Sequence, residues 1–233
     1  EKKDFVDKIC CFTQEEGEIM GLEQKKGVLL ACSENGILRI FKESHNEKTD
    51  IRVGNHIARM RQNPFQSCEV ATGGNENVLK LWDLNKPKQP LFKAKNVRND
   101  QLDLRVPDFV KDIGFIQTSA SLAKIIVGTA YHKLRLYDPK AQKRPVLDIS
   151  YKESPITCVS VPSHEKFVII GNTYGDMAAI DIRNGANLGS YKSFSGSIND
   201  IQCHKTESLV ASCGLDRFLR IHHVDTRQLV DKV

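Results

Sequence analysis

The sequence lacks the long apolar runs that membrane proteins and secreted precursors carry. No apolar stretch approaches the roughly 20 residues that a membrane-spanning helix needs, and the longest are short runs such as residues 167–170. The first residues, 1–4, are charged and polar, so we expect no secretory signal there. Because the chain does not begin with methionine, we expect a further segment to precede it.

Paired cysteines and glycosylation signals are also absent. The seven cysteines are an odd number with irregular spacing, no two form a Cys-x-x-Cys pair, and no Asn-x-Ser/Thr site occurs. This pattern predicts free thiols in a reducing compartment. The net charge of +5 permits an anionic partner without requiring one, and 40% hydrophobic with 27% charged residues is typical of a globular chain.

A repeat runs through the whole chain. Five segments each contain an apolar run, a short polar turn and a second apolar run that closes on one bulky residue. The closing residues are Phe41, Trp82, Tyr137, Ile180 and His222. Another short apolar run precedes each pair, at residues 19–22, 57–60, 110–113, 156–159 and 198–201. Two independent markers thus keep the same register, which makes chance a poor explanation.

A period of about 40–45 residues with short strands and polar turns is the signature of WD-repeat propeller blades. Trp82-Asp83 is the one complete Trp-Asp dipeptide, and the Gly-His dipeptide usual in such repeats is missing. We therefore predict an all-β WD-repeat β-propeller, with about five blades present out of seven.

The domain prediction is a single partial propeller over residues 1–233, with an inserted segment at about 93–107. Residues 5–12 fit an outer strand whose blade lacks its inner strands, and a last strand begins near residues 228–230 and stops at once. We expect N-terminal blades to lie outside this chain, since a propeller must close to remove its sheet edges. A complete five-bladed ring is the alternative.

Two sets of residues recur at fixed places in the repeat. Small residues occupy one place in the middle strand, namely Cys32, Gly73, Gly128, Gly171 and Cys213. We expect them to be packing residues where neighbouring backbones converge. Cations recur in the following strand as Arg39, Lys80, Arg135 and Arg220. For these we expect a packed stem with the charged head in solvent.

The sequence predicts no enzyme, no catalytic residue, no metal and no cofactor. It contains no Gly-x-Ser-x-Gly elbow, no phosphate-binding Gly-Lys-Ser/Thr and no His-Glu-x-x-His. Cys203-His204 and His222-His223 could form a metal site of nitrogen and sulfur ligands. Against this, His222 stands where the repeat needs its closing bulky residue. Asp216, in the tight turn before Phe218, is expected to cap that turn through backbone amides.

The one stretch that breaks the period is the candidate binding site. The step from Trp82 to Tyr137 is about a dozen residues longer than the other steps. The extra residues mix cations with acids and an amide, and the predicted partner-binding set is Lys93, Lys95, Arg98, Asn99, Asp100, Asp103 and Arg105. Propeller insertions project from loops, where binding usually happens. We predict a mixed-charge contact for a protein. A solvated loop and a cover for the side of one blade remain alternatives, and gripping phosphate alone is disfavoured because the carboxylates would repel it.

This segment also carries a resemblance. Residues 93–100 (KAKNVRND) and 102–107 (LDLRVP), together with 71–77 (ATGGNEN) and 211–217 (ASCGLDR), resemble a family of nucleolar WD-repeat factors of large ribosomal subunit assembly. The resemblance implies a non-catalytic scaffold in the nucleolus and nucleus that docks pre-ribosomal particle proteins, with direct contact to ribosomal RNA left open. It implies two further partners, an AAA-type ATPase and the RNA helicase of the nuclear exosome. It also implies a basic tail that follows the propeller, and we expect that C-terminal tail to lie outside this chain.

A second hypothesis is a peptide-reading adaptor of chromatin or ubiquitin-ligase complexes. Such a propeller needs an aromatic or acidic pocket at the mouth of its channel. Tyr131 and Tyr174 lie in turns before their closing strands and could contribute to one.

Overall fold

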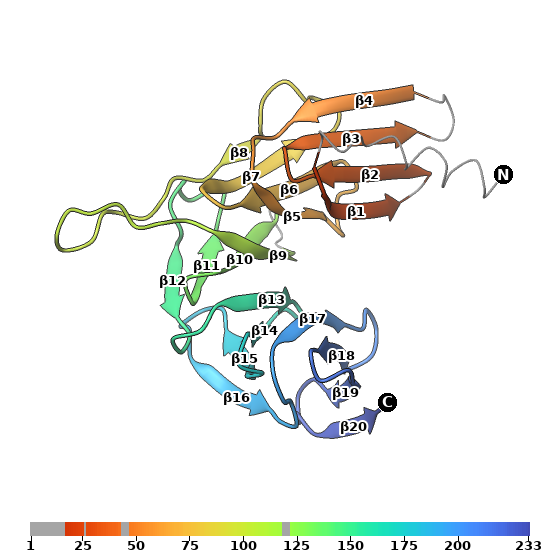
Figure 1. Cartoon of the computed structure of the whole chain (residues 1–233), viewed down its shortest axis with the longest axis vertical. Helices are drawn as coiled ribbons and strands as arrows, with labels where there is room; N and C mark the ends of the chain where they lie inside the picture. Colours follow the sequence, from red (N-terminus) through yellow and green to blue (C-terminus); the bar gives the residue numbers. More distant parts are fainter. Residues whose placement is uncertain (1–16, 26, 43–46, 118–121) are drawn as a thin grey trace. The chain divides into compact units, whose positions relative to one another are not determined.

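The computed structural model describes residues 17–25, 27–42, 47–117 and 122–233, and the expected outer strand at 5–12 lies outside them. In the described residues all regular structure is β. Twenty strands form five antiparallel sheets of four strands each (Figure 1).

The chain falls into two compact units, one ending at Lys93 and the other beginning at Ala94. The first unit holds β1 (Ile19–Lys25), β2 (Val28–Ser33), β3 (Ile37–Lys42), β4 (Glu47–Arg52), β5 (Ile57–Gln62), β6 (Glu69–Gly74), β7 (Asn77–Asp83) and β8 (Phe92–Lys93). The second unit begins with β9 (Val110–Ile116), β10 (Lys124–Thr129), β11 (Lys133–Tyr137) and β12 (Leu147–Ser150). It continues with β13 (Ile156–Ser160), β14 (Phe167–Asn172), β15 (Met177–Asp181), β16 (Asn187–Tyr191), β17 (Ile198–Cys203), β18 (Leu209–Gly214), β19 (Leu219–His223) and β20 (Leu229–Lys232).

Each sheet is a simple meander in which every strand pairs with the next along the chain. The first strands of successive sheets pack against one another, β1 against β5 in the first unit and β9, β13 and β17 in the second. This is the blade topology of a WD-repeat propeller. The prediction of an all-β fold with five blade-like sheets is confirmed.

The first strand of each sheet contains a β-bulge, and in β5, β13 and β17 the bulge lets two apolar residues face the preceding sheet of the same unit. In β13 the register shifts between Ile156 and Cys158. Side chains alternate between the two faces of a regular strand, so residues three apart would point to opposite faces. The extra residue of a bulge corrects this phase, and Ile156 and Val159 both reach Gly128 of β10.

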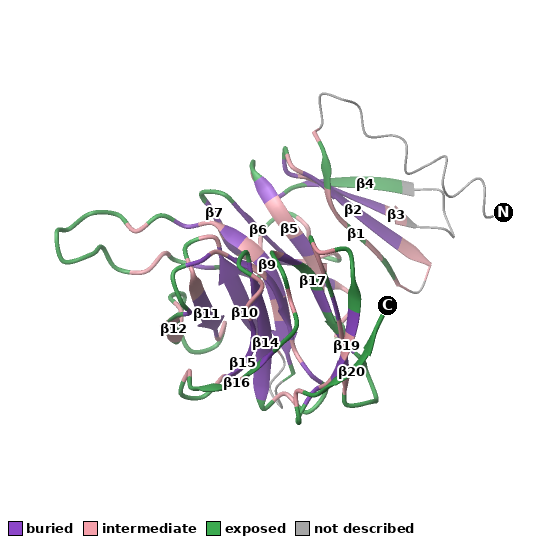
Figure 2. Ribbon diagram, turned by 60° about the horizontal axis from the view of Figure 1, so that its bottom comes forward, coloured by how far each residue is buried: buried purple, intermediate pink, exposed green. Residues whose placement is uncertain are grey.

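Gly128 is the small residue that makes room for this contact. A Cβ atom there would lie 2.6 Å from Cγ2 of Ile156 and 2.8 Å from Cγ2 of Val159. The next pair of sheets repeats the arrangement, with Gly171 of β14 beneath Ile198 and Ile201 of β17, each 3.0 Å from the position a Cβ would take. The buried sheet faces that result are purple in Figure 2.

The prediction for the recurrent small residues is confirmed at Cys32 and wrong at Cys213. Cys32 is fully buried in a cluster with Ile57 and Met60, and burial raises the pKa of its thiol to about 12. Cys213 is exposed. The covering strand comes from the next sheet along the chain, and in the described residues no sheet follows β20.

The prediction that the recurrent arginines hold their charge in solvent is also wrong. Arg39, Arg135 and Arg220 are among the largest fully buried side chains, only 1–2% exposed. Each guanidinium meets a carboxylate, namely Asp50 at 2.9 Å, Asp108 at 3.0 Å and Asp216 at 2.6 Å. The planar guanidinium matches a carboxylate and is weakly hydrated, which makes arginine suited to buried pairing.

Asp216 also caps its turn, as the sequence predicts. Its Oδ2 accepts a hydrogen bond from the Ser195 amide at 3.1 Å, and its Oδ1 accepts a longer one from the Phe218 amide. The hydrogen bond from Arg220 is the largest cause that lowers the pKa of Asp216, from 3.8 to about 2. One carboxylate thus joins the turn to the buried arginine.

We predict that Gly128→Ala destabilises the protein by about 1–3 kcal/mol, the usual range for overpacking a core. The added methyl group meets branched side chains on the neighbouring sheet, and these cannot move aside without disturbing their own contacts. Urea unfolding measures the loss. Gly114→Ala is the matched control, because its nearest atoms lie at 3.0 and 3.1 Å and less movement is needed. Equal stability of Gly128→Ala and the unchanged chain would contradict this account of the packing.

We predict an acid-sensitive contribution from Asp216. Its pKa is lower in the folded chain than in the unfolded chain, so its ionised form stabilises the fold above about pH 4. That stability is lost as the pH falls from about 4 towards 2. Unfolding free energies measured at pH 7, 4 and 3 should therefore fall less steeply for Asp216→Asn than for the unchanged chain. Asp231→Asn, at an exposed position, should keep the original pH profile; parallel profiles for all three proteins would refute the assignment.

Candidate functional site

The extra residues form one long excursion between β8 and β9. We call residues 94–109 the inserted loop; it belongs to the second unit and contains no strand of its own. Both views show it extending away from the sheets of that unit (Figures 1 and 2).

Both ends of the inserted loop are fixed to the sheet β9–β12. At the start, Ala94 is buried and the Lys95 amide donates to the Lys143 carbonyl at 2.8 Å. At the end, Asp108 is buried and accepts a hydrogen bond from Nη1 of Arg135 at 3.0 Å. The loop therefore leaves and re-enters its sheet at defined points.

Polar side chains shape the tip of the loop. Oδ1 of Asp100 accepts hydrogen bonds from the amides of Leu102 and Leu104, both at 2.9 Å. Nδ2 of Asn99 donates to the carboxylate of Asp103 at 2.9 Å, and Asp103 itself has a positive φ of 58°. Asn and Asp are the residues whose short side chains form such turns and tolerate a left-handed backbone. The tip thus has a defined shape without a packed core.

The structure brings six of the seven predicted site residues together on the inserted loop. All seven are exposed, but Lys93 ends β8 in the first unit. Asn99, Asp100 and Asp103 are engaged within the loop, so they hold its turn in addition to any external contact. The side chains of Lys95 and Arg98 form no hydrogen bond or ion pair with a described residue. The polar members therefore shape the loop, and these two cations face solvent.

Two exposed residues of the inserted loop are absent from the predicted partner-binding set. Leu102 is 78% exposed and Leu104 is 59% exposed, both at the tip between Arg98 and Arg105. In the sequence Leu102-Asp103-Leu104 apolar and polar residues alternate, as they do in a half-buried strand. The sequence therefore does not reveal that the two leucines are exposed. Only the loop geometry shows that both leucines lie in water.

The residues considered for metal binding and peptide reading have other surroundings. His222 is buried, with its ring against Tyr191 and Phe194. Cys203 is buried as well, and burial raises the pKa of its thiol to about 11. Across the described ranges, no group of three or more His, Cys, Asp or Glu residues is placed to hold a metal ion. Tyr131 and Tyr174 are exposed, in the turns β10–β11 and β14–β15.

No helix in the described part of the chain is long and apolar enough to cross a bilayer.

Comparisons with known proteins bear on the repeat and on the inserted loop. The family model "WD domain, G-beta repeat" matches residues 185–223. WD repeat-containing protein 74 of Bos taurus is 47% identical over 225 residues, which cover 94% of this chain and 58% of the relative. The Homo sapiens protein of the same name is 46% identical with the same coverage. Ribosome biogenesis protein NSA1 of Meyerozyma guilliermondii is 30% identical over 95% of this chain and 62% of the relative.

The chain thus spans less than two thirds of the length of these relatives. The similarity to WD repeat-containing protein 74 covers almost all of this chain. Together with the five blade-like sheets, it confirms the resemblance that the sequence carries: the chain has a WD-repeat fold and is similar over nearly its whole length to WD repeat-containing protein 74.

Proposed function

We propose that this chain is a non-catalytic scaffold in the biogenesis of the large ribosomal subunit, and that it docks proteins of the pre-ribosomal particle through the inserted loop. The relatives named for ribosome biogenesis supply the process. The observation that carries the docking role is the exposed tip of the loop, where two leucines stand between cations.

The tip has the chemistry of a protein contact. Interfaces combine an apolar centre with a polar rim, and arginine is enriched in them. Leu102 and Leu104 supply apolar surface, while Arg98 and Arg105 flank it. The hydrogen bonds of Asp100 hold the tip in one shape before binding, which lowers the entropy lost on docking.

Contact with pre-ribosomal RNA is a second part of the proposal. Lys95 and Arg98 are exposed without a described partner, so both are available to phosphate. Asp100 and Asp103 already accept hydrogen bonds from within the loop, which reduces the repulsion they would exert on a nucleic acid. Such a contact should weaken steeply with salt, whereas leucine-centred docking should not.

The proposal extends to location, partners and domain structure. We place the protein in the nucleolus and nucleus, with an AAA-type ATPase and the RNA helicase of the nuclear exosome as further partners. We also take the five sheets, with the insertion at 93–107, as part of a larger seven-bladed propeller. The greater length of the relatives supports this last point, since they have room for more blades.

We predict that the triple variant Lys95→Glu, Arg98→Glu, Arg105→Glu folds normally and loses association with large-subunit precursors. Charge reversal places three carboxylates on the docking tip, and like charges oppose association. Co-sedimentation with precursor particles measures the loss. A second triple variant, Lys86→Glu, Lys88→Glu, Lys140→Glu, makes the same charge change at exposed lysines outside the loop and should sediment as the unchanged protein does. If the loop variant still co-sediments in full, the inserted loop is not the docking site.

We predict that Asp100→Ala weakens the same association about tenfold without lowering the melting temperature. The variant loses two hydrogen bonds of about 1 kcal/mol each, so the tip samples other shapes when unbound. Hydrogen exchange at the amides of Leu102 and Leu104 should become faster, which reports the loop directly. Asp231→Ala serves as the control. Faster exchange with unchanged association would show that tip shape does not matter for docking.

A further inference from the structure

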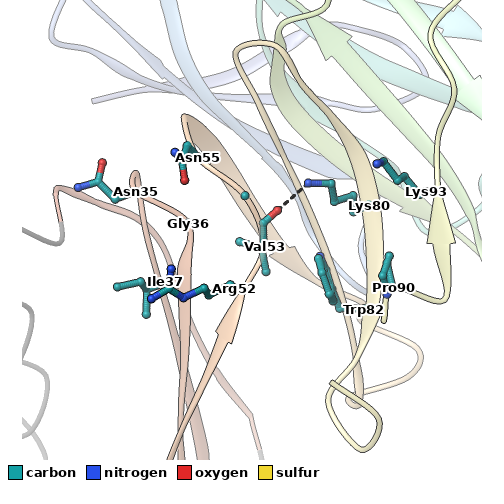
Figure 3. A pocket seen from close by; sticks show the side chains of 11 residues that line it. Asn35, Gly36, Ile37, Arg52, Val53, Asn55, Lys80, Trp82, Pro90 and Lys93 are labelled. Atoms are coloured by element: carbon teal, nitrogen blue, oxygen red, sulfur yellow. Dashed lines mark hydrogen bonds between the residues drawn. The ribbon is translucent and has the colours of Figure 1, made fainter. Parts of the chain in front are cut away.

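The first unit contains a pocket of about 520 Å³ between the sheets β1–β4 and β5–β8 (Figure 3). This volume is within the range of sites that bind small ligands or single side chains of a partner. Eleven residues line the pocket, drawn from the turn β2–β3, from β3 and β4, from the chain between β4 and β5, and from β7, β8 and the chain between them.

The lining is strongly basic. Three cations reach it from different strands, Arg52 at the end of β4, Lys80 within β7 and Lys93 at the end of β8. None of the eleven lining residues is acidic. The side chains of Arg52 and Lys93 form no hydrogen bond or ion pair with a described residue. The lining therefore carries three positive charges and no carboxylate to balance them.

Lys80 is the least exposed of the three cations. Its Nζ donates to the carbonyl of Val53 at 2.7 Å, which uses one of its three N–H donors (Figure 3). Burial, and then repulsion by Lys93, lower the pKa of Lys80. An anion in the pocket would reduce the repulsion between Lys80 and Lys93 and accept hydrogen bonds from the other two N–H groups of Lys80.

The backbone at Gly54 and the apolar side chains of the lining leave room for an anion beside Lys80. Gly54 has a φ of +100°, and a Cβ there would lie 2.8 Å from Nζ of Lys80, so only glycine leaves the ammonium in place. The indole of Trp82 is fixed by a hydrogen bond of 3.0 Å from its Nε1 to Oγ1 of Thr72. Ile37 and Pro90 add apolar surface to the lining.

We propose that this pocket binds the acidic side chains of a protein partner, with carboxylates paired to Lys80 and Lys93 of one sheet and to Arg52 of the other, and the aliphatic stems against the apolar walls. Carboxylates match the donors that remain on the three cations. Single-stranded RNA would need an exposed aromatic face for its bases to stack on. Trp82 is the one aromatic residue of the lining and is only 5% exposed, which favours a peptide over RNA.

This site is distinct from the inserted loop and does not depend on the proposed role in ribosome biogenesis. Only Lys93 belongs to both the pocket and the predicted partner-binding set. The test needs only the purified 233-residue chain, so its result is independent of whether that chain associates with ribosomal precursors.

Trp82 is the only tryptophan of the chain, so its fluorescence reports the pocket directly. An octaglutamate peptide should change the Trp82 emission in a saturable manner at low salt. The double variant Arg52→Gln, Lys93→Gln should bind the peptide at least tenfold more weakly. The control Lys86→Gln, Lys88→Gln makes an equal charge change at exposed lysines outside the pocket and should retain the original affinity. Circular dichroism and melting temperature confirm that both variants fold.

Three outcomes would overturn the proposal. The first is no emission change with octaglutamate. The second is equal weakening in the pocket variant and the control, which would show attraction to overall charge alone. The third is binding of an octauridylate RNA that depends on Arg52 and Lys93 while octaglutamate does not bind, which would make the pocket a nucleic acid site.

Discussion

The contact between the bulged first strand of one sheet and the small residue of the preceding sheet is the constraint on which the fold depends. A sheet without side chains at that point allows another sheet to come close, and a strand with shifted phase presents two apolar residues to it. The contact needs both the bulge and the small residue. Without the bulge one of the two residues would turn to the other face, and without glycine the sheets would stand further apart. Within each unit, this repeated contact stacks separate meanders as blades: two sheets in the first unit and three in the second.

The buried arginines add a second, polar constraint. Removing one partner of such a pair leaves an uncompensated charge in the core, so the pairs favour one register over others more than they add net stability. Arg135 has a particular position, because its partner Asp108 is the last buried residue of the inserted loop. The same ion pair therefore satisfies a charge inside the sheet β9–β12 and fixes the point where the loop returns to it.

Sequence reasoning found the elements whose pattern is local. The first three strands of every sheet were predicted because their apolar runs recur at one period. Among the outer strands of the sheets only β20 was predicted, near residues 228–230. The sequence gives little sign of the others, since β4 is largely polar and β8 has only two residues, and backbone pairing alone defines them. Burial of the arginines could not be foreseen, because Asp50 and Asp108 lie 11 and 27 residues from their partners in the chain. The basic pocket could not be predicted from the sequence for the same reason. Arg52, Lys80 and Lys93 line one pocket only once two sheets have formed.

The hydrogen bonds of Asp100 have one more consequence. They end on the backbone amides of residues 102 and 104, and every amino acid except proline offers such an amide. The turn therefore places no demand on the side chains at these two positions, and serine or lysine would form it equally well. Folding does not account for leucine at both. One aspartate thus sets the shape of the tip, while the side chains at positions 102 and 104 can vary to suit a partner without changing that shape.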